Sequence, residues 1–95
     1  SMSGPHQSNT PEQAVNTFIE DHVLDWDGLA TKIVGPEFET LEGGRVSFEF
    51  LALRRSGYDG SLTSASRYQG QLVRRGQAYA VASWDRMSIP TAQFE

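Results

Sequence analysis

Alternation of apolar and polar residues is the feature that most limits how this chain can fold. It extends over residues 45–55, 62–73 and 78–87, and its period of two residues is that of a strand with two unlike faces. Turn-forming residues separate these segments at 56–60 and 74–77. Because such short turns join antiparallel neighbours, the sequence predicts an antiparallel sheet in which each strand pairs with the next.

A shorter alternating segment, residues 37–41, precedes these strands. The Glu-Gly-Gly sequence at residues 42–44 indicates a hairpin turn after it, which makes this segment the first of about four strands. Residues 29–34 also alternate and could form either a short strand or a helical turn. Gly35-Pro36 is expected to break the regular structure between these two segments.

The amino-terminal part of the chain predicts a helix. Thr10 can cap its start, Pro11 suits the first helical position, and Gln13 completes a capping box. Gly28 is expected to end it. Between them, side chains spaced by three or four residues share one face, which predicts an amphipathic helix with the stripe Val15, Phe18, Ile19, His22, Val23 and Trp26.

These elements predict an α+β fold, in which an amino-terminal amphipathic helix packs on a bent antiparallel meander of about four strands. The small residues Ala78, Ala80 and Ala82 are expected to let the helix lie close against the sheet. The expected core joins the helix stripe to one face of the sheet and comprises Val15, Phe18, Ile19, Val23, Val46, Phe48, Phe50 and Trp84.

The length of 95 residues is that of one domain, which we place at residues 10–95. Residues 1–9 are polar and are expected to form a disordered tail, in which the opening Ser1-Met2 resembles a cleavage scar. A chain of this size buries only about 60–65% of its unfolded surface, so pairing with a second copy would add stability.

Composition excludes several classes of function. The chain has no cysteine and only two histidines, which argues against disulfides and against a structural metal site. No apolar run approaches the ~20 residues of a membrane span, so we expect no membrane association and a cytoplasmic location. The net charge of −4 argues against nucleic-acid binding. Residues 1–42 carry a net charge of −7 and residues 43–95 a net charge of +3. The two halves could attract each other, or both could be solvated faces.

The helix segment TPEQAVNTFIEDHVLDWDGL, followed by the strand segments GGRVSFEFLALRR and ASRYQGQLVRRGQAYAVASWDRM, resembles the nuclear-transport-factor-like superfamily, also called polyketide-cyclase-like, within the cystatin-like α+β architecture. The resemblance implies a curved sheet, a cone-shaped apolar cavity and dimers that form through the sheet. Members of that superfamily include isomerases, dehydratases and cyclases as well as non-catalytic binding domains.

Asp21, His22 and Asp25 lie within one turn of the predicted helix, and Asp21 and Asp25 share a face. The resemblance implies that a histidine–carboxylate pair in the cavity could act as general base and acid, with Asp85 as a further carboxylate. The alternative is a surface carboxylate pair beside a histidine at the edge of the core.

Residues that could hold a ligand or partner lie on the strands. Tyr68 shares a predicted strand face with two serines, and Arg67 and Trp84 are further candidates. Arg54 and Arg74 stand near strand ends and could gather at one rim as an anion site. Solvent-facing strands and charged hairpin ends explain the same residues.

The sequence thus favours a small non-catalytic domain that binds a small apolar ligand or a protein partner and forms a homodimer through its sheet. The alternative is a small isomerase, dehydratase or cyclase that uses the histidine–carboxylate pair. Neither hypothesis requires a cofactor, and we expect none.

Overall fold

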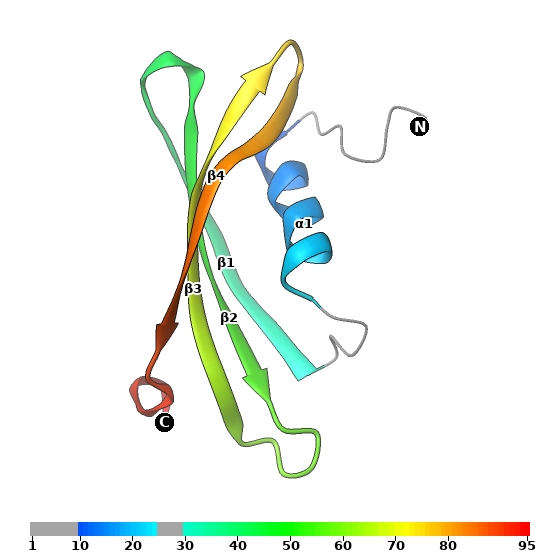
Figure 1. The fold of residues 1–95 in the computed structure, drawn as a ribbon, viewed down its shortest axis with the longest axis vertical. Coiled ribbons are helices and arrows are strands. Elements are labelled where there is room, and N and C mark those ends of the chain that lie inside the picture. The colour runs from blue at the N-terminus through cyan, green and yellow to red at the C-terminus, as the bar shows by residue number, and fades with distance from the viewer. Residues whose placement is uncertain (1–9, 25–29) are drawn as a thin grey trace.

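The structure is a computed structural model that describes residues 10–24 and 30–95. It contains one helix followed by a four-stranded antiparallel sheet, an α+β fold as predicted (Figure 1). The elements, in chain order, are α1 (Pro11–His22), β1 (Thr31–Thr40), a short 3₁₀ turn η2 (Glu42–Gly44), β2 (Val46–Arg55), β3 (Leu62–Arg75), β4 (Ala78–Ile89) and a second 3₁₀ turn η3 (Thr91–Phe94).

Strand order in the sheet follows chain order, β1-β2-β3-β4. Helix α1 lies along one face of this sheet (Figure 1), which we call the helix face. The opposite face, which we call the outer face, carries the alternate side chains. On β2, for example, Phe48 and Phe50 point to the helix face and are buried, whereas Glu49 between them is exposed on the outer face.

The start of α1 is the predicted one. Thr10 Oγ1 accepts a hydrogen bond of 3.1 Å from the backbone N–H of Gln13, and Pro11 occupies the first turn. The helix ends at His22, earlier than the predicted end at Gly28, and the N–H groups of Val23 and Leu24 both donate to Ile19 O. The predicted stripe residue Trp26 and the predicted stop at Gly28 lie outside the described residues.

Seven of the eight predicted core residues are buried, and the exception is Trp84, which is 47% exposed. Trp84 lies on β4, an edge strand, where no further strand closes over it. The buried side chains that form the main core are Ala14, Val15, Phe18, Ile19, Val23, Val46, Phe48, Phe50, Ala52, Tyr68 and Leu72. Tyr68 and Leu72 were not among the predicted core residues, although both belong to the helix face.

Phe18 joins α1 to the sheet through aromatic contacts. Its ring centroid lies 4.8–6.3 Å from those of His22, Trp84, Phe48, Phe50 and Tyr68. The contacts with the sheet are tilted or edge-to-face, the arrangements that aromatic rings favour. One helical side chain therefore touches residues of β2, β3 and β4 at once.

The prediction that Gly35-Pro36 breaks the chain is wrong. Strand β1 continues through these residues, and the pairing with β2 shifts register between Val34 and Glu37. Since β1 is an edge strand, a proline at a bulge removes no necessary hydrogen bond of the ladder. The two predicted segments, residues 29–34 and 37–41, thus contribute to one strand.

A second register shift corrects the prediction for β4. The pairing between β3 and β4 shifts between Gln71 and Leu72, so Val81 pairs with the buried Leu72. Val81 and Tyr79 pack against the main core, and Ala82 is exposed. The prediction assumed that alternation continues without interruption from Ala78 to Trp84. It therefore placed the alanines toward the helix, whereas the shift turns Tyr79 and Val81 to that face.

A third register shift lies in the pairing between β2 and β3, where Arg54 pairs with Ser64 but Arg55 pairs with Leu62. The shift reverses the alternation at the start of β3. Uninterrupted alternation along β3 would place Leu62 on the same face as Tyr68 and Leu72. In the structure Leu62 instead belongs to a small second cluster with Leu53 and Ala65, against which Ile89 packs. This cluster explains why the far end of β2 is apolar on both faces.

The turn between β2 and β3 is held by side chains. Asp59 Oδ1 accepts a hydrogen bond of 3.0 Å from the backbone N–H of Ser61, and Ser56 Oγ accepts one of 3.0 Å from the N–H of Tyr58. The hydrogen bonds from Ser61 hold the pKa of Asp59 below its ordinary value, because they stabilise the charged carboxylate.

Gly70 allows an aromatic ring to lie against the sheet. It pairs with Phe48 on one side and with Trp84 on the other. A Cβ atom at this position would approach Phe48 Cζ to 2.6 Å and would also collide with the carbonyl oxygen of Ser83. The absence of a side chain at Gly70 therefore makes room for the Phe48 ring.

We expect Phe18→Ala to lower the free energy of unfolding by about 3–5 kcal/mol, because it opens a cavity among five rings. The urea midpoint, followed by circular dichroism, measures this loss. Phe18→Leu keeps most of the apolar volume and should cost less. A loss below about 1 kcal/mol for the alanine variant, the size typical of an unremarkable substitution, would contradict the central position of Phe18.

We expect Gly70→Ala to destabilise the protein by about 1–3 kcal/mol, since the new methyl group must displace Phe48 or the backbone of β4. Gly57→Ala is the matched control, because no atom lies within 4 Å of the position that its Cβ would occupy. The control should change the unfolding free energy by less than about 0.5 kcal/mol. Equal thermal midpoints for the two variants would refute this role of Gly70.

Candidate functional site

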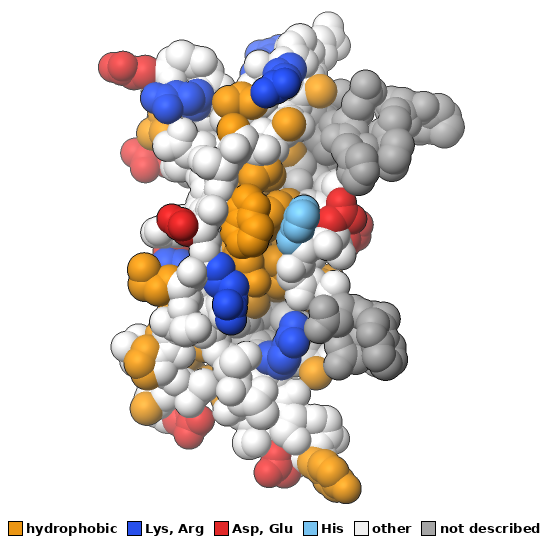
Figure 2. Space-filling model, viewed as in Figure 1, with side chains coloured by type: hydrophobic (Ala, Val, Ile, Leu, Met, Phe, Trp, Pro, Cys, Tyr) orange, Lys and Arg blue, Asp and Glu red, His pale blue; other side chains and the backbone are white. Residues whose placement is uncertain are grey.

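A groove lies on the helix face of the sheet where α1 ends. We call it the helix-end groove, and its volume is about 360 Å³. Figure 2 shows this side of the molecule, with a strip of hydrophobic side chains beside a histidine and flanked by basic side chains. The residues that line it are His22, Val23, Thr31, Ala52, Arg54, Ser64, Ser66, Tyr68, Trp84 and Arg86.

Strand pairing brings these side chains to one face. Ser64, Ser66 and Tyr68 alternate along β3 and point to the helix face. Ser64 pairs with Arg54 on β2, and Tyr68 pairs with Arg86 on β4. The serines that are unusual for a core-facing strand therefore form part of the groove's wall rather than of the packed interior.

Hydrogen bonds hold both arginines of the groove. Arg86 Nε donates to Ser66 Oγ at 3.2 Å, and Ser66 is 5% exposed. Arg54 Nε donates to Thr31 Oγ1 at 3.2 Å, and its Nη2 donates to the backbone carbonyl of Val23 at 3.4 Å. Arg54 thereby ties the end of α1 to β1 and β2, while Arg86 lies on the opposite side of the groove.

Aromatic rings form a wall of the groove. Tyr68 stacks on Phe50 with centroids 4.9 Å apart and an interplanar angle of 10°. The ring centroid of Trp84 lies 5.9 Å from that of Tyr68, with an interplanar angle of 29°. It lies 6.0 Å from the centroid of His22, with an interplanar angle of 44°. Because Trp84 stands on an edge strand, part of its indole faces solvent.

The residues predicted to be catalytic do not come together in one site within the described part of the chain. The His22 ring lies 4.8 Å from Phe18 and forms no hydrogen bond or ion pair with a carboxylate among the described residues. His22 and Asp21 line a smaller hollow of about 140 Å³ beside Val81 of β4. Asp85 pairs with Gln69 on the outer face, away from His22. Asp25 lies outside the described residues.

The proposed ligand-binding residues divide into two groups. Tyr68, Trp84 and Arg54 meet in the helix-end groove. Arg67 points to the outer face, where its Nε lies 3.2 Å from Glu49 Oε2 in an ion pair without hydrogen-bond alignment. Arg74 lies at the β3–β4 hairpin, with its Nε donating to Gly76 O at 3.0 Å.

Arg54 and Arg74 do not share a rim. Each stands near the end of its own strand, and β2 and β3 run antiparallel, so the two arginines lie at opposite ends of the sheet. Sequence reasoning placed Tyr68 with two serines on one face but missed Arg86 as a neighbour of Tyr68 and Ser66. The position of Arg86 depends on the β3–β4 register, for which the sequence carries no direct signal.

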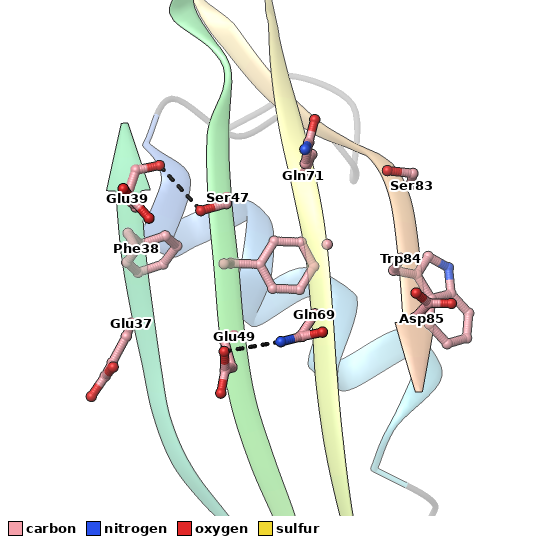
Figure 3. Close-up of a pocket in the computed structure, with 12 residues that line it drawn as sticks. Glu37, Phe38, Glu39, Ser47, Glu49, Gln69, Gln71, Ser83, Trp84 and Asp85 are labelled. Atoms are coloured by element: carbon pink, nitrogen blue, oxygen red, sulfur yellow. Dashed lines mark hydrogen bonds between the residues drawn. The ribbon is translucent and has the colours of Figure 1, made fainter. Parts of the chain in front are cut away.

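The outer face carries a second, larger depression of about 700 Å³ (Figure 3). In this view α1 lies behind the sheet, and Gln69 Nε2 donates to Glu49 Oε1 at 3.2 Å. One row of paired residues crosses all four strands there and consists of Glu37, Glu49, Gln69 and Asp85. The next row consists of Val34, Leu51, Arg67 and Met87. An acidic row thus borders a row that is mainly apolar with one basic residue.

Within residues 10–24 and 30–95, no three side chains of the metal-ligating types gather into a group that could hold a metal ion. The described part of the chain also has no helix long and apolar enough to cross a membrane.

Comparison of the chain with protein-family models, with curated proteins and with solved structures found no match in any of the three. The resemblance to nuclear-transport-factor-like proteins therefore stays a prediction. Because a fold hosts many functions, the geometry of the site carries the argument about function.

Proposed function

We propose that this chain is a small non-catalytic binding domain of the nuclear-transport-factor-like type, with an amphipathic helix packed into a bent meander. Its ligand occupies the helix-end groove, and two copies pair through the outer face. The observation that carries the proposal is the half-exposed Trp84 indole, which stands beside polar groups of Ser66 and Arg86 in one groove.

The groove suits a small ligand by size and by chemistry. Ligand sites are concave, typically about 300–1,000 Å³, with apolar or aromatic walls and a few placed polar groups. The helix-end groove, at about 360 Å³, falls at the lower end of that range. Trp84 and Tyr68 supply apolar surface, and Ser66 and Arg86 supply hydrogen-bonding groups.

Binding without catalysis agrees best with the surroundings of His22. A general base is usually oriented by a second group, most often a carboxylate that accepts a hydrogen bond from its other ring nitrogen. His22 forms no such bond within the described part of the chain, and its ring instead packs on Phe18. This arrangement supports a structural or ligand-contacting histidine.

The test is a ligand-observed NMR screen of a fragment library, followed by ¹⁵N–¹H spectra of the labelled protein with each fragment that binds. We expect fragments to shift the backbone resonances of Ser66, Tyr68, Trp84 and Arg86 together. Resonances of the β3–β4 hairpin, residues 75–78, are the internal reference, because this hairpin lies at the other end of the sheet from the groove. If no fragment perturbs the groove residues, the proposed ligand site is refuted.

The alternative function is an isomerase, dehydratase or cyclase that uses a histidine–carboxylate pair in the cone-shaped cavity. The observation in its favour is the hollow that His22 and Asp21 line together. The two functions separate when a bound fragment is incubated with the protein and followed by NMR. Time-dependent conversion that is lost in His22→Gln would establish the enzyme and refute the non-catalytic proposal.

The two rows on the outer face support pairing with a second copy. Val34 is 42% exposed and Met87 56% exposed, which leaves apolar surface open to solvent. If a copy is turned over about an axis that crosses the strands, its acidic row lies against the apolar row of the other copy. Arg67 of each copy then faces Gln69 of the other, between the carboxylates of Glu49 and Asp85, which gives complementary charge in a two-fold interface.

We expect sedimentation velocity at tens of micromolar protein to report a dimer, and Met87→Glu to convert it to a monomer by placing a charge in the apolar row. Tyr58→Glu is the control, because Tyr58 is fully exposed at 100% in the β2–β3 turn. It should leave the dimer intact. A monomeric parent protein at this concentration would remove the dimer from the proposal without affecting the ligand groove.

A further inference from the structure

Hydrogen-bond donors in the helix-end groove exceed the acceptors that the described residues offer them. Ser66 Oγ accepts from Arg86 Nε, but its own O–H donates to no described acceptor. The Tyr68 hydroxyl and the two terminal nitrogens of Arg86 likewise have no acceptor within the described chain. None of these atoms is a buried polar atom without a partner, so the donors are open to water and available to a ligand that supplies acceptors.

The charged side chains among the described lining residues of the groove are basic. Arg54 and Arg86 line it, and none of its described lining residues is a carboxylate. This contrasts with the chain as a whole, whose net charge is −4, and with the acidic row on the outer face. Arg54 already donates hydrogen bonds to Thr31 and to the Val23 carbonyl, so we do not count it among the groups that bind the ligand. Arg86 is the arginine placed to contact a ligand directly.

The number and kind of donors fit a carboxylate. A carboxylate has two oxygens with about four acceptor positions, and it forms a bidentate pair with a guanidinium. The terminal nitrogens of Arg86 and the hydroxyl of Ser66 supply such a set on adjacent strands. The Ser66 hydroxyl is buried and bonded to Arg86, so both groups are held in place before a ligand arrives.

The rest of the ligand must meet aromatic surface. The Trp84 indole is next to Arg86 along β4 and stands on the same wall as Tyr68. A flat ring can stack on the exposed part of the indole, which adds contact area at little entropic cost. A groove of about 360 Å³ has space for one or two fused rings together with a carboxylate.

We propose that the ligand of the helix-end groove is a small aromatic carboxylate, whose carboxylate binds Arg86 and Ser66 and whose ring stacks on Trp84. This inference rests on the proposed ligand-binding function and names the chemical class of the ligand.

The test compares 2-naphthoate with 2-naphthamide, which has the same shape and no charge, by titration of the ¹⁵N-labelled full chain at constant ionic strength. We expect naphthoate to shift the resonances of Ser66 and Trp84, including the Trp84 indole N–H, which Trp84→Phe identifies. Naphthoate should bind at least about tenfold more tightly than naphthamide, because its hydrogen bonds to Arg86 are charge-assisted.

Arg86→Gln should remove most of this preference and leave the weak affinity for naphthamide unchanged. Arg75→Gln removes one exposed arginine at the β3–β4 end of the sheet, outside the groove, and is the matched control, with both affinities expected to stay the same. Thermal midpoints of both variants report whether they are folded. Because Arg86 is exposed, we expect its replacement to leave the fold intact.

Three outcomes would overturn the inference. They are equal affinity for naphthoate and naphthamide, an unchanged preference in Arg86→Gln, and stronger shifts of the same residues by inorganic phosphate than by naphthoate. Each leaves the proposed ligand groove standing if other fragments bind there. If no fragment of any charge shifts the groove residues, the proposed function itself fails.

Discussion

The contact between the Phe18 ring and the aromatic side chains of the sheet is the interaction on which the rest of this structure depends. In a chain of 95 residues the core is thin, and α1 is the helix that lies on the helix face. Phe18 does this by touching residues of β2, β3 and β4 together, including Phe50 and Tyr68. Helix α1 ends one turn after Phe18, at His22, and the helix-end groove begins there.

Gly70 and Trp84 explain why the groove has an aromatic wall. Gly70 gives the Phe48 ring space against β3. Trp84, the other neighbour of Gly70, stands beside the packed core on the edge strand β4. An indole in the middle of the sheet would have neighbouring strands on both sides. At the edge it keeps one side in the aromatic cluster and leaves the other open. The row Phe48, Gly70 and Trp84 therefore contributes both to the packed core and to the wall of the groove.

Local patterns predicted much of this fold, and pairing decided the rest. Thr10, Pro11 and the spacing of Val15, Phe18 and Ile19 were enough to place the start and the buried face of α1. The long alternating segments were enough to predict the strands. Uninterrupted alternation would place Leu62 and Val81 on the wrong faces, because one extra residue at a register shift reverses the alternation. The contact of Arg86 with Ser66 depends on pairing between strands, which no local pattern encodes.

Strand β3 contributes to both surfaces of the molecule. Ser66 and Tyr68 belong to the helix-end groove, and Arg67 and Gln69 between and after them belong to the outer face. A single-residue insertion or deletion before this segment would exchange the two sets and place a charged side chain against the core. The length of the β2–β3 turn therefore matters for both faces, because it sets which residues of β3 lie on each. Over evolution these surfaces are free to diverge by substitution, whereas changes of length are confined to positions where a bulge can absorb them.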